Sequence, residues 1–185
     1  MGLLPLLINN PVLFFMLAVM LLYSVIAHEI AHGLVAYVFG DDTAYISGRL
    51  TLNPMSHLDP IGTLMLFIAG FGWAKPVPVN YFRLMHTKFG FISVALAGCV
   101  MNILIATVCL FFMQFDIVKH NPTLMNLLPL LAKINIVLGS FNLIPIPPLD
   151  GSRVLMSVLP VEARNALAAF EPFGFFMIIL LLFTG

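Results

Sequence analysis

Charged residues are scarce in this 185-residue chain, which has 8 Lys and Arg against 8 Asp and Glu. Runs of basic residues are missing, so we expect no nucleic-acid partner and no acidic partner surface. The first residues also lack the basic start and small-residue cleavage site of a secretory signal, so the first apolar run is expected to be retained. Cysteine is rare too. Cys99 and Cys109 would lie about 15 Å apart on a helix, too far for a disulfide, and are expected to be reduced packing residues.

Apolar residues dominate what remains. They make up 61% of the chain, and the mean hydropathy is +1.07. A soluble core of this size cannot bury so much apolar surface, which indicates a protein that lies in a lipid bilayer. Neither an internal repeat nor a long linker divides the sequence. Residues 1–185 are therefore predicted to form one integral membrane domain.

The first apolar run, residues 11–39, contains the polar group His28-Glu29-Ile30-Ala31-His32. On a helix, positions i and i+4 share a face, so His28 and His32 can offer two imidazoles to one zinc ion. In H-E-x-x-H metalloproteases the Glu is the general base that takes a proton from the attacking water. Single histidines in apolar helices usually serve packing. That interpretation has to account for three polar groups at once in lipid, where each ionisable side chain is costly unless it is paired, so a metal site is favoured.

Three runs are long enough to cross a bilayer. Residues 11–39 are predicted to form the first span, with Gly40 as its C-cap, and residues 89–115 the second. The third is expected to begin near Pro129 and to end at the prolines of 145–148.

Shorter segments are predicted between and after the spans. Residues 61–73 are too short for a comfortable span and indicate a partly inserted or re-entrant element, followed by an extended loop over 75–79. Residues 43–52 are predicted to form a short strand pair or bent strand, which could pair with an unwound substrate. Residues 166–184 fit a short amphipathic helix followed by a short or tilted span. The predicted fold is an all-α polytopic membrane protein with a short β-strand element and a partly inserted segment.

Orientation follows from the positive charges. Arg49, Lys75, Arg83 and Lys88 lie between the first two spans, whereas Lys119 stands alone in the next loop. The positive-inside rule places the more basic stretch in the cytoplasm. We therefore expect a multi-pass protein of the plasma membrane whose site is buried nearer the cytoplasmic side.

A catalytic zinc needs a third protein ligand. The candidates are Asp150, Asp59, His57 and Glu171. Asp150 is favoured because the prolines before it break a helix at membrane depth, and non-helical backbone is tolerated there only where it lines protein or a watery cavity. Two alternatives stay open. Asp150 could cap the following helix, and His57 and Asp59 could stabilise the turns of their loop.

Five motifs resemble the site-2 protease family of intramembrane zinc metalloproteases, in its short subgroup without PDZ or CBS domains. The similarity covers about residues 11–155. The motifs are HEIAH at 28–32, NPMSHLDPIG at 53–62, FGWAKPVPVN at 71–80, AGCVMN at 97–102 and FNLIPIPPLDG at 141–151.

The resemblance implies an intramembrane zinc metalloprotease, with one zinc per chain, that hydrolyses a peptide bond within or near a transmembrane segment of a membrane protein. Six residues match the family's functional positions: His28, His32 and Asp150 as zinc ligands, Glu29 as general acid and base, and Asn102 and Asn142 as groups that polarise the substrate or hold the peptide. From the residues alone, both asparagines could instead bond across helices for packing. The alternative function is a non-catalytic membrane metal-binding or helix-binding protein. The oligomeric state stays open.

Overall fold

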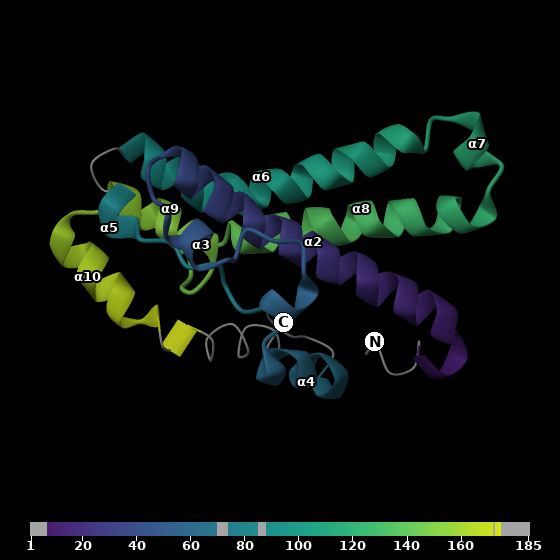
Figure 1. The fold of residues 1–185 in the computed structure, drawn as a ribbon, viewed down its shortest axis with the longest axis horizontal. Helices are drawn as coiled ribbons and strands as arrows, with labels where there is room; N and C mark the ends of the chain where they lie inside the picture. Colours follow the sequence, from purple (N-terminus) through teal and green to yellow (C-terminus); the bar gives the residue numbers. More distant parts are fainter. Residues whose placement is uncertain (1–6, 70–73, 85–87, 172, 175–185) are drawn as a thin grey trace.

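Three long helices form the body of the protein in a computed structural model, which describes residues 7–69, 74–84, 88–171 and 173–174. They are α2 (Pro11–Val38), α6 (Lys88–Phe112) and α8 (Pro122–Asn142) (Figure 1). At 1.5 Å per residue they measure about 42, 38 and 32 Å, against about 30 Å for the hydrocarbon core of a bilayer. Within the described residues, these three helices have the length and hydropathy needed to cross a membrane.

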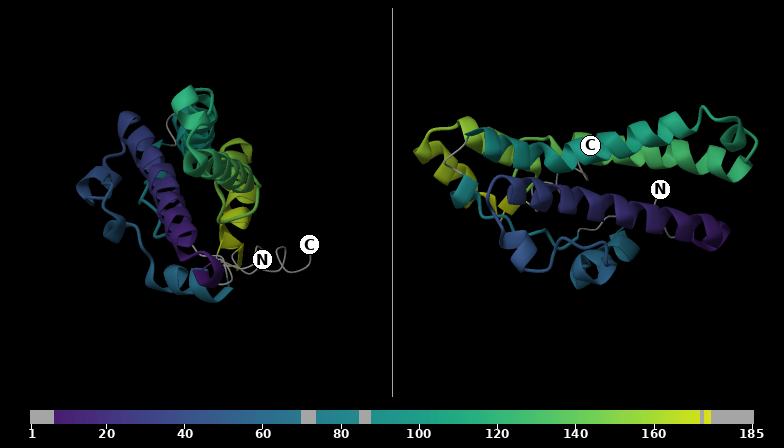
Figure 2. Two further views of the ribbon diagram at one scale, coloured as in Figure 1. Left: turned by 90° about the vertical axis from the view of Figure 1, so that its right-hand side faces the viewer. Right: turned by 45° about the horizontal axis from the view of Figure 1, so that its top comes forward.

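Shorter helices lie around this bundle. They are α3 (Thr43–Ile46), η1 (Pro54–Ser56), α4 (Pro60–Ala69), α5 (Tyr81–Leu84), α7 (Asp116–Lys119), α9 (Asp150–Val158) and α10 (Val161–Ala169). Helix α7 joins α6 to α8 at one end, while α3, α5, α9 and α10 gather at the other (Figure 1). In both views of Figure 2, α2 lies beside the α6–α8 hairpin.

Helix α6 is the centre of the packing and contacts α2, α8 and α9. Its buried face carries many small residues, among them Ala95, Gly98 and Ala106. Small side chains let membrane helices approach one another closely. Cys99 and Cys109 are buried on the same helix and are both free thiols, as expected.

The first predicted span is confirmed. Helix α2 begins at Pro11 after Asn10, whose side chain accepts a hydrogen bond from Leu13 N at 3.1 Å. It ends at Val38, and Gly40 follows with φ of 92°, the left-handed conformation that commonly closes a helix.

The predicted start of the third span is wrong. Helix α8 begins at Pro122 rather than near Pro129, which lies inside the helix. The stronger start signal is Asn121, whose Oδ1 accepts from Thr123 N at 3.1 Å and from Leu124 N at 3.2 Å. The predicted end is confirmed, because α8 stops at Asn142 before the prolines.

The predicted strand over residues 43–52 is also wrong. This stretch contains α3 and turns, and the described part of the chain contains only an isolated bridge between Leu58 and Ala74. The side chain of Asp41 accepts from Thr43 N at 3.2 Å, which favours a turn at the start of the stretch. Strand preference depends on pairing with a neighbour, and no pairing partner for this stretch is found among the described residues. This segment therefore offers no strand to a substrate.

Two other predictions concern short segments. Helix α4 supplies the short helix expected within 61–73, and residues 75–79 lie outside any helix, which is consistent with the predicted loop. Residues 70–73 and most of the predicted final segment, 175–184, lie outside the described residues. Insertion of these two segments into the bilayer stays a prediction.

Candidate metal centre

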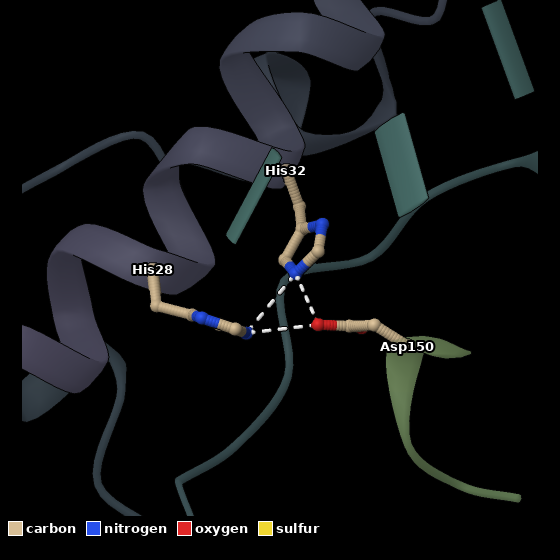
Figure 3. Close-up of side chains that lie close together, drawn as sticks. All are labelled: His28, His32 and Asp150. Atoms are coloured by element: carbon tan, nitrogen blue, oxygen red, sulfur yellow. Dashed lines mark hydrogen bonds and ion pairs between the residues drawn. The ribbon is translucent and has the colours of Figure 1, made fainter. Parts of the chain in front are cut away.

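Three side chains from two distant parts of the chain converge at one point (Figure 3). His28 and His32 project from adjacent turns of α2, and Asp150 is the first residue of α9. Asp150 Oδ2 lies 3.1 Å from His28 Nε2 and 3.2 Å from His32 Nε2, and the two Nε2 atoms are 3.2 Å apart. Both imidazoles are buried, each with 6% exposure. Within the described residues, this is the group of His, Cys, Asp and Glu side chains that could hold a metal ion.

The hydrogen bonding of His32 fixes which nitrogen faces the cluster with a lone pair. His32 Nδ1 lies 2.7 Å from the backbone oxygen of Val94, which can only accept, so Nδ1 carries the proton. The neutral ring then presents a lone pair at Nε2. A backbone carbonyl behind a histidine is the usual support of a metal ligand.

Asp150 brings a negative charge to this lone pair. Burial acts to raise the pKa of its carboxyl, but contact with His28 and His32 lowers it to about 2, so the carboxylate is ionised at neutral pH. Two acceptors this close repel each other unless a proton or a cation lies between them. The two nitrogens and one carboxylate oxygen are a typical catalytic zinc donor set. Tetrahedral ligands with bonds of about 2.0 Å lie about 3.3 Å apart, close to the separations seen here. The residues therefore fit a zinc ion.

Gly98 of α6 forms the wall of the site opposite α2. A Cβ at this position would lie 2.4 Å from His28 Cε1 and 2.5 Å from Nε2 of both His28 and His32. That space is where the imidazole nitrogens converge. Glycine therefore allows α6 to pack directly against the two imidazoles.

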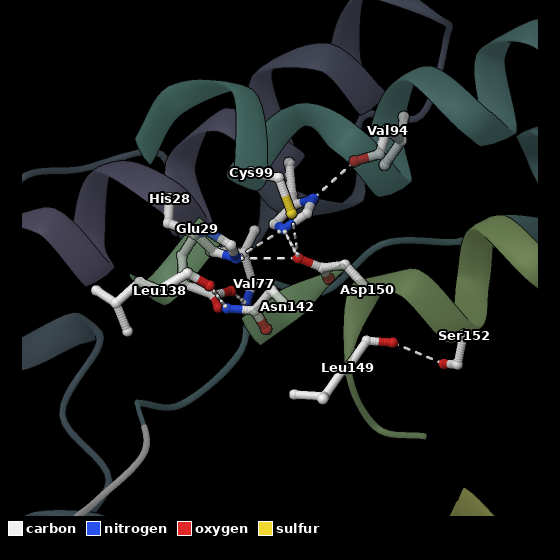
Figure 4. A network of polar contacts seen from close by, with 11 residues as sticks. His28, Glu29, Val77, Val94, Cys99, Leu138, Asn142, Leu149, Asp150 and Ser152 are labelled. Carbon is white, nitrogen blue, oxygen red and sulfur yellow. Dashed lines mark hydrogen bonds and ion pairs between the residues drawn. The ribbon is translucent and has the colours of Figure 1, made fainter. Parts of the chain in front are cut away.

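Glu29 lies next to the cluster and is held by an unexpected partner (Figure 4). The backbone N–H of Val77 donates to Glu29 Oε2 at 2.8 Å, across 48 residues of sequence. Val77 belongs to the extended segment 75–80, which passes over the site. A carboxylate with one oxygen bound to an amide still has its second oxygen for a water molecule.

The site opens into a cavity of about 1040 Å³. His28, His32, Glu29 and Asp150 line it together with the segment 76–80 and residues of α9 and α10. A cavity of this size accommodates several residues of an extended peptide.

The two predicted asparagines have different surroundings. Asn142, at the end of α8, lines the cavity, and its Nδ2 donates to Leu138 O at 3.0 Å. Asn102 is 1% exposed on α6, one turn beyond Gly98, and neither of its amide atoms has a hydrogen-bond partner among the described residues. The structure thus places Asn142 at the cavity wall and Asn102 in the packed interior.

The other candidate ligands lie elsewhere. His57 is fully buried, but its Nε2 donates to Thr51 O at 2.8 Å. Asp59 accepts from Gly62 N at 2.7 Å at the start of α4, and Glu171 forms an ion pair with Arg153. His57 and Asp59 therefore stabilise the turns of their loop through these hydrogen bonds, as the alternative interpretation predicts. Asp150 does not cap α9 with its side chain, so that alternative is wrong.

Sequence reasoning missed two contributors to the site. Gly98 falls within the AGCVMN motif, and nothing local in the sequence indicates that it faces the imidazoles. The Val77 amide is a backbone group, which has no residue signature. One signal was available: prolines have no N–H, so Pro76-Val77-Pro78 contains a single donor.

Comparison with known proteins identifies a family and several relatives of this chain. A model of peptidase family M50 matches residues 114–184, a stretch that includes Asp150. Two relatives are named putative zinc metalloproteases. YwhC of Bacillus subtilis (strain 168) is 38% identical over 175 residues, covering 91% of this chain and 80% of YwhC. Rip2 of Mycobacterium tuberculosis (strain H37Rv) is 32% identical over 167 residues, covering 86% of this chain and 63% of Rip2.

A third relative is the zinc metalloprotease MJ0392 of Methanocaldococcus jannaschii, which is 30% identical over 151 residues, 82% of this chain. The chain spans most of YwhC but only 63% of Rip2 and 36% of MJ0392. No solved structure matches the chain significantly.

Proposed function

This chain belongs to peptidase family M50, and on that premise we propose that it hydrolyses a peptide bond within or near a transmembrane segment of another membrane protein. It is a zinc metalloprotease and a multi-pass integral membrane protein. The observation that carries the substrate proposal is the place of the cluster: His28, His32 and Asp150 meet beside helices long enough to cross a bilayer, at the wall of a peptide-sized cavity.

Each residue of the cluster has an assigned role in this proposal. His28, His32 and Asp150 hold the zinc ion. When bound, zinc supplies Lewis-acid polarisation of the scissile carbonyl and lowers the pKa of water. Glu29 is the general base and later the general acid: its carboxylate takes a proton from the attacking water and delivers it to the leaving amine.

The asparagines are assigned to the substrate. Asn142 Nδ2 uses one of its two hydrogens on Leu138 O, and the second can donate to a substrate carbonyl in the cavity. Asn102 lies one turn beyond Gly98 on α6 and has a buried amide without a hydrogen-bond partner among the described residues, which supports a role in polarising or holding the substrate. Donors aimed at a developing oxyanion are a common source of rate enhancement.

We further assign the protein to the plasma membrane as one domain with the site nearer the cytoplasm. Support comes from the basic residues, because Arg49, Lys75, Arg83 and Lys88 all lie between the first two spans. A cysteine introduced at Arg83 should react with membrane-impermeant reagents from the cytoplasmic side. Reaction from the other side would overturn the orientation.

The decisive experiment separates zinc binding from proton transfer. Glu29→Gln is nearly isosteric and leaves all three ligands in place, so the purified variant should bind one zinc per chain. Its cleavage of single-span membrane proteins in liposomes should fall by about 10² to 10⁴-fold or more, because general acid–base catalysis is lost.

The control is wild-type protein with and without a chelator. Full cleavage by Glu29→Gln would refute the assigned mechanism. Failure of the wild-type protein to cleave any of a broad panel of such substrates would favour the non-enzymatic alternative.

A further inference from the structure

The extended segment 74–80 is tied down at both ends. Lys75 N donates to His57 O at 2.8 Å at one end, and Asn80 N donates to Asp41 Oδ2 at 2.6 Å at the other. Between these anchors, Val77 supplies the one N–H of the Pro76-Val77-Pro78 stretch, and that N–H donates to Glu29 Oε2. The position of the Val77 amide therefore depends on what holds the ends of the segment.

Asp41 is a buried carboxylate with both oxygens in use. It is 0% exposed, and its backbone N donates to Ala36 O at 2.9 Å, which ties it to the end of α2. Oδ1 accepts from the backbone N and hydroxyl of Thr43, and Oδ2 accepts from Asn80 N. A buried carboxylate is costly unless such hydrogen bonds compensate it. Asp41 thus connects the helix that carries Glu29 to the segment that carries Val77.

Gly33 makes room for this connection. It lies one turn after Glu29 on α2, where a Cβ would be 3.0 Å from Val77 Cγ1 and 2.6 Å from Leu50 Cδ2. The bare surface of α2 lets the segment approach until the Val77 amide reaches the carboxylate.

We propose that Asp41 is a positioning residue for catalysis: through Asn80 it holds the Val77 amide against Glu29 Oε2, which orients Oε1 of Glu29 toward the water. The inference rests on the proposed function of Glu29 as general base. Asp41 touches neither the zinc ligands nor the substrate in this role. Its effect passes through the backbone of 77–80.

The test compares two neighbouring aspartates in the full-length protein. Asp41→Ala should lower kcat by about ten- to hundredfold, the usual value of a hydrogen bond to a charged group, with KM and zinc content unchanged. Asp42→Ala is the matched control, since Asp42 is 46% exposed and pairs with Arg83 at the surface. It should leave kcat unchanged. Asp41→Asn keeps one acceptor oxygen and should give an intermediate kcat.

A second pair removes the donor itself. Val77→Pro deletes the N–H in a segment that is already extended between prolines, and should lower kcat as Asp41→Ala does. Val77→Ala keeps the N–H and should lower kcat less than Val77→Pro does. These variants decide the question if Asp41→Ala does not fold.

Wild-type kcat for Val77→Pro, or equal loss of kcat in Asp41→Ala and Asp42→Ala, would overturn the positioning role. Because Glu29→Gln tests the general base separately, an inactive Glu29→Gln beside a fully active Val77→Pro would reject this inference alone. Full activity of Glu29→Gln would reject the proposed function.

Discussion

Two regions of this protein contain deeply buried histidines, and they differ in what surrounds the ring nitrogens. In the metal cluster, His28 and His32 are each 6% exposed, and their Nε2 atoms face each other and a carboxylate. In the loop before α4, His57 is 0% exposed, and its Nε2 faces the Thr51 carbonyl. Burial alone therefore does not distinguish a metal ligand from a structural histidine.

The distinction lies in donors and acceptors. His57 Nε2 satisfies an acceptor as an ordinary N–H donor, so no cation is needed. In the cluster, the lone pair of His32 meets the negative charge of Asp150, and a proton or a cation between them is needed to relieve the repulsion. That arrangement favours a cation, and the backbone carbonyl of Val94 behind His32 maintains it.

Removing the carboxylate of Asp150 should have the largest effect on zinc binding and cleavage. Asp150→Ala deletes one of three ligands, so the purified protein should lose its zinc, and cleavage should fall by about 10⁴-fold or more. Metal analysis together with a cleavage assay checks both effects. Zinc retained at one per chain in Asp150→Ala, but lost in His57→Ala, would reverse the ligand assignment.

Adding a side chain at Gly98, which packs against the two imidazoles, should have the next largest effect on zinc binding. A Cβ at Gly98 would lie within 2.5 Å of both imidazole Nε2 atoms, so Gly98→Ala must displace them. Zinc affinity should fall by about ten- to hundredfold or more, as for other changes that misorient ligands. Competition with a zinc-sensitive dye measures this.

Gly139→Ala on α8 is the matched control for that substitution. Its added Cβ would meet Asn102 Cβ and Cys99 O at an ordinary 3.4 Å. Zinc affinity close to wild type is expected. An equal loss in both variants would show that helix packing in general, rather than the Gly98 wall, controls the site.

The smallest effect on chemistry is expected at the structural histidine. His57→Ala leaves the Thr51 carbonyl without its donor and should lower the free energy of unfolding by about 1 to 3 kcal/mol. Zinc content should stay at one per chain. Denaturant titration in detergent measures the stability, and metal analysis measures the zinc content. A His57→Ala variant that is folded but free of zinc would show that His57 is not merely a structural histidine.

Much of the fold was predictable because its signals are local. Long apolar runs predicted the three spans, and Pro11 and Gly40 marked the ends of the first. The errors arose where two local signals competed. Pro129 indicates a helix start, but Asn121-Pro122 is a stronger start signal. The β-branched residues of 43–52 favour a strand, but the aspartates before them favour a turn. Neither Pro129 nor the β-branched residues could be weighed correctly without their spatial neighbours.

The site was predictable in part for the same reason. The i, i+4 spacing of His28 and His32 places both on one face of any helix, so the sequence by itself determined the histidine pair and the neighbouring carboxylate of Glu29. The apolar run around them determined that this pair lies at membrane depth. These properties need only the period of a helix and the composition of its residues.

Tertiary structure alone decided the rest. Asp150 is 118 residues from His32, and its arrival at the cluster depends on how α9 packs against α6. Gly98 faces the imidazoles, and the Val77 amide reaches Glu29, because separate segments fold against α2. Contacts of this kind join residues with no shared local pattern, and the backbone group among them has no side chain to reveal it. The meeting of these distant groups therefore depends on how the helices pack, whereas the spacing of His28 and His32 depends only on the helical period.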